Sequence, residues 1–280
     1  MRTVRDPRAD WNWKVPVPDL VRRIVRAAAD SLGYTTHPAQ PPVTSPAEAF
    51  PEDFTAEERE ICRSVARYTM TSNERIVSLI RAVQYVERFR VPGAVVECGV
   101  WRGGSMMAIA KMLLALNSTG RELFLFDTYS GMPDPCDADV DIHDRSGSAL
   151  VAELRNLPRE QQAERHVLAL CPLENVTANL LSTGYPQERL HFIEGRIENT
   201  VPALAPDRIA LLRLDTDWYE STRHELTHLF PRLSRHGVLI VDDYGHWRGA
   251  RRAVDEFLEQ SREPIFLSRI DYTGRLAVRC

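Results

Sequence analysis

The chain has 280 residues, of which 44% are hydrophobic, so it can bury a sizeable core in one or two domains. Its formal net charge of −4 argues against a nucleic-acid-binding surface, which normally needs a dense basic face. The five cysteines show no metal-ligand spacing, and residues 1–20 contain no apolar signal segment. No apolar run approaches the ~18 residues of a membrane span. We therefore expect a cytoplasmic protein with reduced thiols, and neither nucleic acid nor a membrane as a partner.

The N-terminal part is interrupted by proline. Residues 17–31 have apolar residues at helical spacing, and the proline-rich segment 37–54 that follows disfavours helix. We expect residues 1–54 to form an N-terminal helix and linker, and residues 55–280 to form the main domain. The apolar stripe of the first helix needs a partner, and a second subunit would supply it, so we expect a homo-oligomer. A further helix is expected at 72–89, with Ser72 at its start.

Beyond Val91, apolar strands alternate with helices. Strands are expected at 93–99, 122–129, 190–195, 209–215 and 237–243, and helices at 104–117, 172–183, 222–234 and 249–260. The strands are continuous apolar runs, which are typical of parallel strands covered on both faces. The last segment, 264–280, predicts two strands joined by a turn at Asp271–Gly274. The expected fold is therefore α/β, with a mostly parallel, seven-stranded sheet that ends in an antiparallel hairpin.

One long insertion breaks the alternation. Residues 131–170 begin with a polar, acidic stretch that contains Pro133 and Pro135. So long a segment inside a compact α/β domain is usually a lid or a binding loop, and a disordered insertion is the alternative. His143 lies in this segment and is a candidate catalytic residue, although a surface histidine is the more common case.

A glycine-rich turn follows the first strand. Gly99, Gly103 and Gly104 precede an apolar helix whose free N–H groups can meet an anion, and glycine allows a ligand to approach the backbone closely. The GxGxxG fingerprint is absent, which weakens the case for a nicotinamide site. Asp127 ends the second strand, where an acid can accept both hydroxyls of a ribose. Together these features indicate a nucleoside cofactor. A tight turn with glycines at steric positions is the alternative for the loop alone.

Two later strands each end in a pair of acids, Asp215 with Asp217 and Asp242 with Asp243. A capping box at 222–225 would start the next helix, which leaves Asp215 and Asp217 without a structural role. Neighbouring carboxyl ends of parallel strands meet, so four acids would raise one another's pKa unless a cation intervened. Carboxylate oxygens suit a hard cation, Mg²⁺ first, with Mn²⁺ and Ca²⁺ as alternatives. Solvated acids at the strand ends are the other interpretation.

Aromatic and histidine residues surround these acids. Trp218 and Tyr219 would either wall a substrate pocket or pack beneath the next helix. His246 follows the second acidic pair, and taken alone it is more often a surface or packing histidine than a catalyst.

Four ordered segments, ECGVWRGGS, LFDTYSGMPDP, RLDTDWYEST and VLIVDDYG, closely resemble the macrocin O-methyltransferase-like family. Members of this family depend on S-adenosylmethionine and Mg²⁺, and methylate sugar hydroxyls of macrolide and aminocoumarin natural products. The resemblance implies a Rossmann-like class I methyltransferase fold and a glycosylated small-molecule acceptor. A catechol-type O-methyltransferase acting on an aromatic diol, and a non-catalytic relative that binds the cofactor, are the alternatives.

The resemblance also implies roles for the matched residues. Asp215, Asp242 and Asp243 would hold the metal, and either Asp217 or Asp215 would act as the base. Asp127 would hold the ribose hydroxyls. The remaining residues that would line the cofactor or acceptor site are Glu97, Gly99, Gly103, Ser105, Thr69, Met70, Ser72, Gly195 and Arg196. His246 and Trp247 have no clear counterpart in the family, so the acceptor side is where this chain departs from it.

Overall fold

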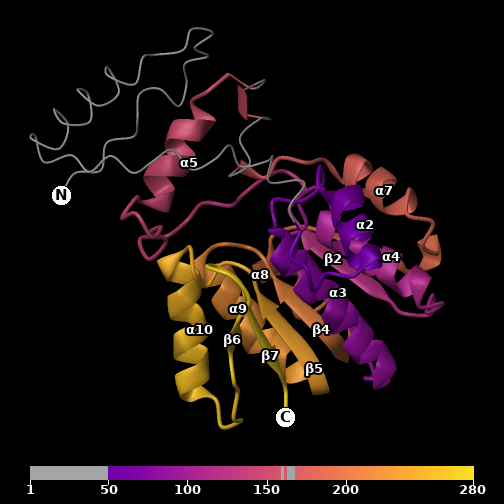
Figure 1. Ribbon diagram of the computed structural model, residues 1–280. Helices are drawn as coiled ribbons and strands as arrows, with labels where there is room; N and C mark the ends of the chain where they lie inside the picture. The colour runs from indigo at the N-terminus through magenta and orange to yellow at the C-terminus, as the bar shows by residue number, and fades with distance from the viewer. Residues whose placement is uncertain (1–49, 159–160, 163–167) are drawn as a thin grey trace, which may run out of the picture. The chain divides into compact units, whose positions relative to one another are not determined.

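The computed structural model describes residues 50–158, 161–162 and 168–280, which Figure 1 draws as a coloured ribbon. The helix expected at 17–31 and most of the proline-rich linker lie outside these residues. The homo-oligomer expected from that helix stays a prediction, as do the domain boundary at residue 54 and the cytoplasmic location. Among the described residues, none of the helices combines the length and the apolar character that crossing a membrane requires.

A seven-stranded sheet in the order β3-β2-β1-β4-β5-β7-β6 forms the centre of the domain. Its strands are β1 (Ala94–Cys98), β2 (Leu123–Asp127), β3 (Leu190–Glu194), β4 (Ile209–Leu214), β5 (Leu233–Val241), β6 (Ser268–Arg269) and β7 (Arg275–Val278). The first five strands pair in parallel, whereas β7 runs antiparallel to β5 and β6 antiparallel to β7. The expected parallel sheet with a C-terminal antiparallel hairpin is confirmed.

Helices cover both faces of the sheet (Figure 1). One face packs against α2 (Ala56–Val65), α3 (Asn73–Arg88), α4 (Gly104–Ala115) and α7 (Leu173–Leu181). The other face packs against α8 (Ile197–Thr200), α9 (Tyr219–Leu229) and α10 (Arg248–Gln260). Successive side chains of a strand point to opposite faces, so Val95 of β1 belongs to the first core and Val96 to the second. Burial on both faces explains why the strands are continuous apolar runs.

The two helices before β1 begin at side-chain caps. Ser72 accepts a hydrogen bond from the backbone N–H of Arg75, which confirms the expected start of α3. The preceding helix, α2, was not expected. It starts with a complete capping box, in which Thr55 accepts from the backbone of Glu58 and the Glu58 carboxylate accepts from the backbone of Thr55.

The expected limits of α9 and β5 are wrong. α9 begins at Tyr219 and is followed by a 3₁₀ turn, Phe230–Arg232. Thr222 and Glu225 are therefore buried inside the helix and form no capping box, and Glu225 instead accepts a hydrogen bond from the Thr216 hydroxyl, at 2.9 Å. β5 begins at Leu233 and not at Gly237, because Leu233 still pairs with Ile209 before the ladder shifts register.

The segment that follows β2 is anchored where it passes α9 and α10. The Asp139 carboxylate is 1% exposed and accepts hydrogen bonds from the backbone N–H groups of Tyr219 and Cys136, each at 2.8 Å. It thereby caps the first residue of α9 from 80 positions away in the sequence. The indole N–H of Trp218 donates to Pro133 O, at 3.1 Å. The described part of the segment also contains a helix, α5 (Gly147–Arg155), so it is folded onto the domain at this point.

Trp218 packs in a small core of its own. Its ring meets that of Trp247 edge-on at a centroid distance of 4.8 Å, beside Val151 of α5. Tyr219 donates its hydroxyl to Glu256 of α10, at 2.7 Å. Of the two interpretations of this aromatic pair, packing is the one that the structure shows.

We expect Asp139→Ala to lower the free energy of unfolding by about 2–3 kcal/mol, because two half-buried N–H groups lose a charged acceptor. Asp137→Ala is the matched control, since Asp137 is exposed two positions away, and it should change stability by less than about 0.5 kcal/mol. Urea denaturation of both variants makes the measurement. Equal losses in the two variants would contradict the anchoring role of Asp139.

Candidate active site

A cavity of about 330 Å³ opens at the carboxyl ends of the parallel strands. This is where ligands bind in open parallel sheets. Each of the first five strands contributes to the wall through residues at or after its carboxyl end. Among them are Gly99 and Ser105, Asp127 and Thr128, Gly195 and Glu198, Asp215 and Asp217, and Asp242, Asp243 and His246. The segment before α3 adds Thr69, Met70 and Thr71, and α3 itself adds Arg75.

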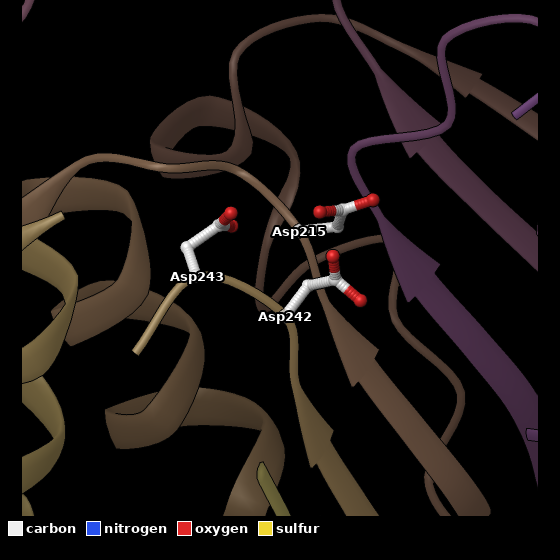
Figure 2. Close-up of side chains that lie close together, drawn as sticks. All are labelled: Asp215, Asp242 and Asp243. Atoms are coloured by element: carbon white, nitrogen blue, oxygen red, sulfur yellow. The ribbon is translucent and has the colours of Figure 1, made fainter. Parts of the chain in front are cut away.

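Three carboxylates converge in this cavity. Asp215 follows β4, and Asp242 and Asp243 follow β5, so adjacent strand ends bring them together (Figure 2). One oxygen from each residue lies within 4.8 Å of the others. These are the residues that the family resemblance assigns to the metal. In the described part of the chain, no other group of three or more acidic, histidine or cysteine side chains is as close.

A buried arginine lies beneath the carboxylates. Arg213 of β4 is 2% exposed, and its guanidinium donates to Glu97 at 2.7 Å, to Asp215 at 2.6 Å and to Asp242 Oδ1 at 2.7 Å. A fourth bond, at 3.0 Å, goes to the hydroxyl of Thr71. Burial disfavours its charge, but Asp215, Asp242 and Glu97 outweigh this effect and raise the pKa of Arg213 further. The arginine therefore stays charged and fixes the acids around it.

A second arginine, Arg75, contacts Asp242 through the other carboxylate oxygen. Arg75 binds Asp242 Oδ2, and its Nε donates to Asp271, at 3.0 Å. Asp242 is thus held through both oxygens.

The remaining acids strongly influence one another. Burial and the neighbouring acids raise the pKa of Asp215 and of Asp243. Burial also raises the pKa of Asp217 to about 7, although its side-chain hydrogen bond with Asp243 opposes this. Asp217 has a φ of 65°, a left-handed conformation that aspartate tolerates better than most residues. This turn places its carboxyl beside Asp243.

The charges of this cluster suit a divalent cation. Two guanidinium groups, Arg75 and Arg213, face six carboxyl groups: Glu97, Asp215, Asp217, Asp242, Asp243 and Asp271. The excess of negative charge lies in a largely buried place, where it is unfavourable without a counterion. The three convergent residues offer only oxygen ligands, the type that Mg²⁺ prefers. The donor set therefore fits the metal that the resemblance implies.

The cofactor side of the cavity contains Asp127 and the loop after β1. Asp127 Oδ2 accepts from the backbone N–H groups of Val100 and Trp101, at 2.6 and 3.0 Å, and Oδ1 accepts from Tyr129, at 2.8 Å. These bonds hold the loop in place. The Thr128 hydroxyl is 3.4 Å from Oδ1, but its shorter bond, at 2.6 Å, is to Gly131 O. Of the about four lone-pair sites of a carboxylate, Asp127 therefore keeps one for a ligand.

The glycines of this loop are required mainly by protein contacts. A Cβ at Gly99 would lie 1.9 Å from the Asp215 carbonyl oxygen. At Gly103, which has a φ of 86°, a Cβ would lie 2.6 Å from the Leu180 side chain of α7. Of these two, only Gly99 also lines the cavity. For Gly103, the steric alternative considered from the sequence is the one that the contacts support.

The residues expected at the cofactor or acceptor site divide into two groups. Those on the cavity wall are Thr69, Met70, Gly99, Ser105, Asp127 and Gly195. Those away from it are Ser72, Glu97, Gly103 and Arg196. Ser72 caps α3 and donates to Asp271 at 2.7 Å, Glu97 is completely buried against Arg213, and Arg196 precedes α8. Burial raises the pKa of Glu97 to about 7, with Arg213 opposing this effect.

The candidate catalytic histidine is not part of the wall either. His143 is exposed in the segment after β2, whereas His246 and Trp247 line the cavity. The cavity is also lined by four residues that were not expected from the sequence: Thr71, Arg75, Tyr272 and Thr273. Arg75 carried no recognisable signal, because a single arginine in a helix has no spacing to mark it. Arg213 did, since it is the one charged residue in the apolar run 209–214, but its role was not inferred.

The fold and the cavity define a Rossmann-like class I methyltransferase, and the solved structure of the O-methyltransferase NovP shares this fold. It aligns with a TM-score of 0.64 and 30% identity, over 79% of this chain and 88% of that one. Residues 31–277 match the macrocin-O-methyltransferase (TylF) family, to which the chain belongs. It is an O-methyltransferase, and its methyl donor is S-adenosylmethionine. The family resemblance is confirmed.

Two relatives show the range of this family. A tetracenomycin 4'-O-methyltransferase of Streptomyces olivaceus is 35% identical over 209 residues, 74% of either chain. The mycinamicin III 3''-O-methyltransferase of Micromonospora griseorubida is 30% identical over 217 residues, 72% of this chain and 78% of its own.

Gly103→Ala should destabilise the fold without weakening cofactor binding, because its Cβ would point at Leu180 and not into the cavity. Gly184→Ala is the matched control, since Gly184 has a φ of 82° with no atom within 4 Å of the added Cβ. The backbone strain, about 1–2 kcal/mol, is then common to both, and Gly103→Ala should lose about 1–3 kcal/mol more through overpacking. Chemical denaturation measures stability, and calorimetry measures affinity for S-adenosylhomocysteine. If Gly103→Ala and Gly184→Ala were equally stable and Gly103→Ala lost affinity for S-adenosylhomocysteine, Gly103 would be required by the ligand.

Proposed function

We propose that the protein transfers a methyl group to a sugar hydroxyl of a glycosylated natural product, with Mg²⁺ held by Asp215, Asp242 and Asp243. The observation that carries this proposal is the convergence of three carboxylate oxygens within 4.8 Å in the cavity that contains the glycine loop. The acceptor class is supported by the relatives. The tetracenomycin enzyme acts on a 2,3-dimethoxy-α-L-rhamnosyl compound, and another relative on demethyldecarbamoylnovobiocin.

The cofactor would lie toward β1, β2 and β3. Gly99 and Ser105 leave room at the start of α4, Asp127 offers its remaining lone pair to the ribose, and Gly195 follows β3 on the same side. Thr69 and Met70 close this part of the wall. Bound S-adenosylmethionine supplies a sulfonium methyl group to an oxygen held in line with it.

The acceptor hydroxyl would be deprotonated at the acids after β4 and β5. Mg²⁺ bound there supplies a Lewis acid that lowers the pKa of the hydroxyl. We assign the base to Asp217, because Asp215 already binds Arg213 at 2.6 Å and belongs to the convergent trio. Asp217 lines the cavity beside Asp243, to which its backbone N–H donates at 3.3 Å, so its carboxylate is near enough to take the proton. Arg213 and Arg75 hold Asp242 in position.

Methyl transfer to glycosylated aromatic and macrolide acceptors should require the metal. Radiolabelled S-adenosylmethionine is supplied with these acceptors and with a catechol, with and without a strong chelator. We expect the sugar of a glycosylated acceptor to be methylated, and this activity to vanish with chelator and return with Mg²⁺ or Mn²⁺. Methylation of the catechol alone would favour the aromatic-diol alternative, and full activity in chelator would disprove the metal's role.

Asp217→Asn and Asp215→Asn should fail for different reasons. Asp217→Asn should bind Mg²⁺ normally while single-turnover rates fall by ~10²–10⁴-fold, because the base is lost. Asp215→Asn removes a ligand charge, so Mg²⁺ affinity measured by calorimetry should fall. Asp242→Asn should also bind Mg²⁺ weakly, with partial rescue at high Mg²⁺. Asp207→Asn is the control, since Asp207 is exposed before β4, at the end of the strands opposite to the cavity. Normal metal binding by Asp215→Asn but not by Asp217→Asn would reverse the two roles.

A further inference from the structure

The turn of the C-terminal hairpin forms part of the active-site wall. Tyr272 and Thr273, between β6 and β7, both line the cavity with the convergent acids. The Thr273 hydroxyl donates to the backbone oxygen of Asp242, at 2.8 Å, and the N–H of Gly245 donates to Thr273 O, at 2.9 Å. A Cβ at Gly245 would lie 1.8 Å from the Tyr272 carbonyl oxygen. The hairpin turn and the turn after β5 are therefore in direct backbone contact.

Asp271 makes this turn rigid. Its Oδ1 accepts from the backbone N–H groups of Thr273 and Gly274, at 2.9 and 2.7 Å. Its Oδ2 accepts from Ser72 and from Arg75, and Arg75 also binds Asp242. The position of the hairpin turn is thus fixed relative to the proposed metal ligand.

Tyr272 is the exception in this tightly packed turn. Its side chain is 54% exposed, whereas the adjacent Thr273 is 2% exposed. On one side the ring meets His246 edge-on, with centroids 6.2 Å apart. His246 also lines the cavity, and its backbone N–H donates to Asp243 O, at 3.0 Å. An exposed aromatic ring therefore stands at the cavity wall, near the acids.

The strand order indicates which ligand this ring meets. Along the sheet, the expected cofactor residues Gly99, Asp127 and Gly195 lie at the carboxyl ends of β1, β2 and β3, and Thr69 and Met70 come from the segment before α3. The acids follow β4 and β5, and the hairpin lies beyond β5. Tyr272 is therefore separated from the cofactor side by the acids. The molecule on its side of the acids is the one that gives up a proton, which is the acceptor.

We propose that Tyr272, backed by His246, is the platform on which the sugar ring of the acceptor stacks while its hydroxyl faces the acids. A pyranose presents an apolar C–H face and polar edges, and an aromatic ring with one wet end complements this shape. Thr273, the residue after Tyr272, donates its hydroxyl to Asp242 O at 2.8 Å, so Tyr272 is only one residue from a contact with a proposed metal ligand. This position favours a contact with the sugar itself, and not with a more distant part of the acceptor. This inference rests on the proposed function, and it makes Tyr272 a specificity-determining residue.

The test uses the glycosylated acceptor with the highest turnover in the assay described above. Tyr272→Ala should raise the acceptor KM by about tenfold, because the stacking and its buried area are lost. The kcat, the KM for S-adenosylmethionine and the Mg²⁺ affinity should stay unchanged, which a merely structural defect would not allow. Tyr272→Phe should keep a KM close to that of the unaltered protein. Phe266→Ala is the matched control, since Phe266 is 84% exposed just before β6 and does not line the cavity.

The methyl glycoside of the same sugar, used as a competitive inhibitor, locates the contact. Its inhibition constant should also rise about tenfold in Tyr272→Ala. An unchanged acceptor KM in Tyr272→Ala would overturn the inference while leaving the proposed function intact. A KM defect without any change in inhibition by the glycoside would also overturn it, and would assign the contact to the aglycone. Failure of the unaltered protein to methylate any glycosylated acceptor would instead refute the proposed function.

Discussion

The active site depends on a guanidinium buried near the carboxyl end of a central parallel strand. Arg213 pairs across the sheet with Glu97 and reaches Asp215 and Asp242 at its own end of the strands. A buried charge is tolerated only where partners satisfy it, and losing one partner typically costs about 3–5 kcal/mol. The acids in turn need the arginine, because without it their repulsion in a dry cavity would be larger. The same contacts therefore stabilise the sheet and orient the carboxylates.

Much of this architecture could be predicted from local patterns. The strands were recognisable as apolar runs, their acidic ends followed from topology, and Ser72 marked the start of α3. The start of α2 carried an equally local signal, the Thr55–Glu58 capping box, so that helix could have been found. The start of α9 could not, because its cap is Asp139, which is distant in the sequence. A sequence window around Thr222 contains a plausible capping box and nothing that contradicts it.

The site residues also divide into those with a local sequence signal and those placed by contacts distant in the sequence. Asp127, Asp215, Asp242 and Asp243 follow strands, and strand order alone places them at the cavity. Arg75 and Tyr272 reach it through tertiary contacts of a helix and a hairpin, which no spacing reveals. Gly103 shows the opposite case. It looks like a ligand-binding glycine in the sequence, yet the atoms nearest its missing side chain belong to α7. A glycine can be required by the backbone conformation and packing or by a ligand that approaches the backbone, and the sequence does not distinguish the two cases.

The attachment of the segment after β2 has a consequence for how such enzymes diversify. Its fixed points are Pro133 and Asp139 on the first residues of α9, and Val140, whose carbonyl accepts from the backbone of Arg248 at 2.8 Å. These points follow one another within eight residues, and α5 comes after them. These points attach the segment independently of α5, which adds the packing of Val151 against the core of Trp218 and Trp247. A graft of α5 that also replaced the stretch of fixed points would have to keep Asp139, because α9, the helix that follows Asp215 and Asp217, would otherwise lose its cap.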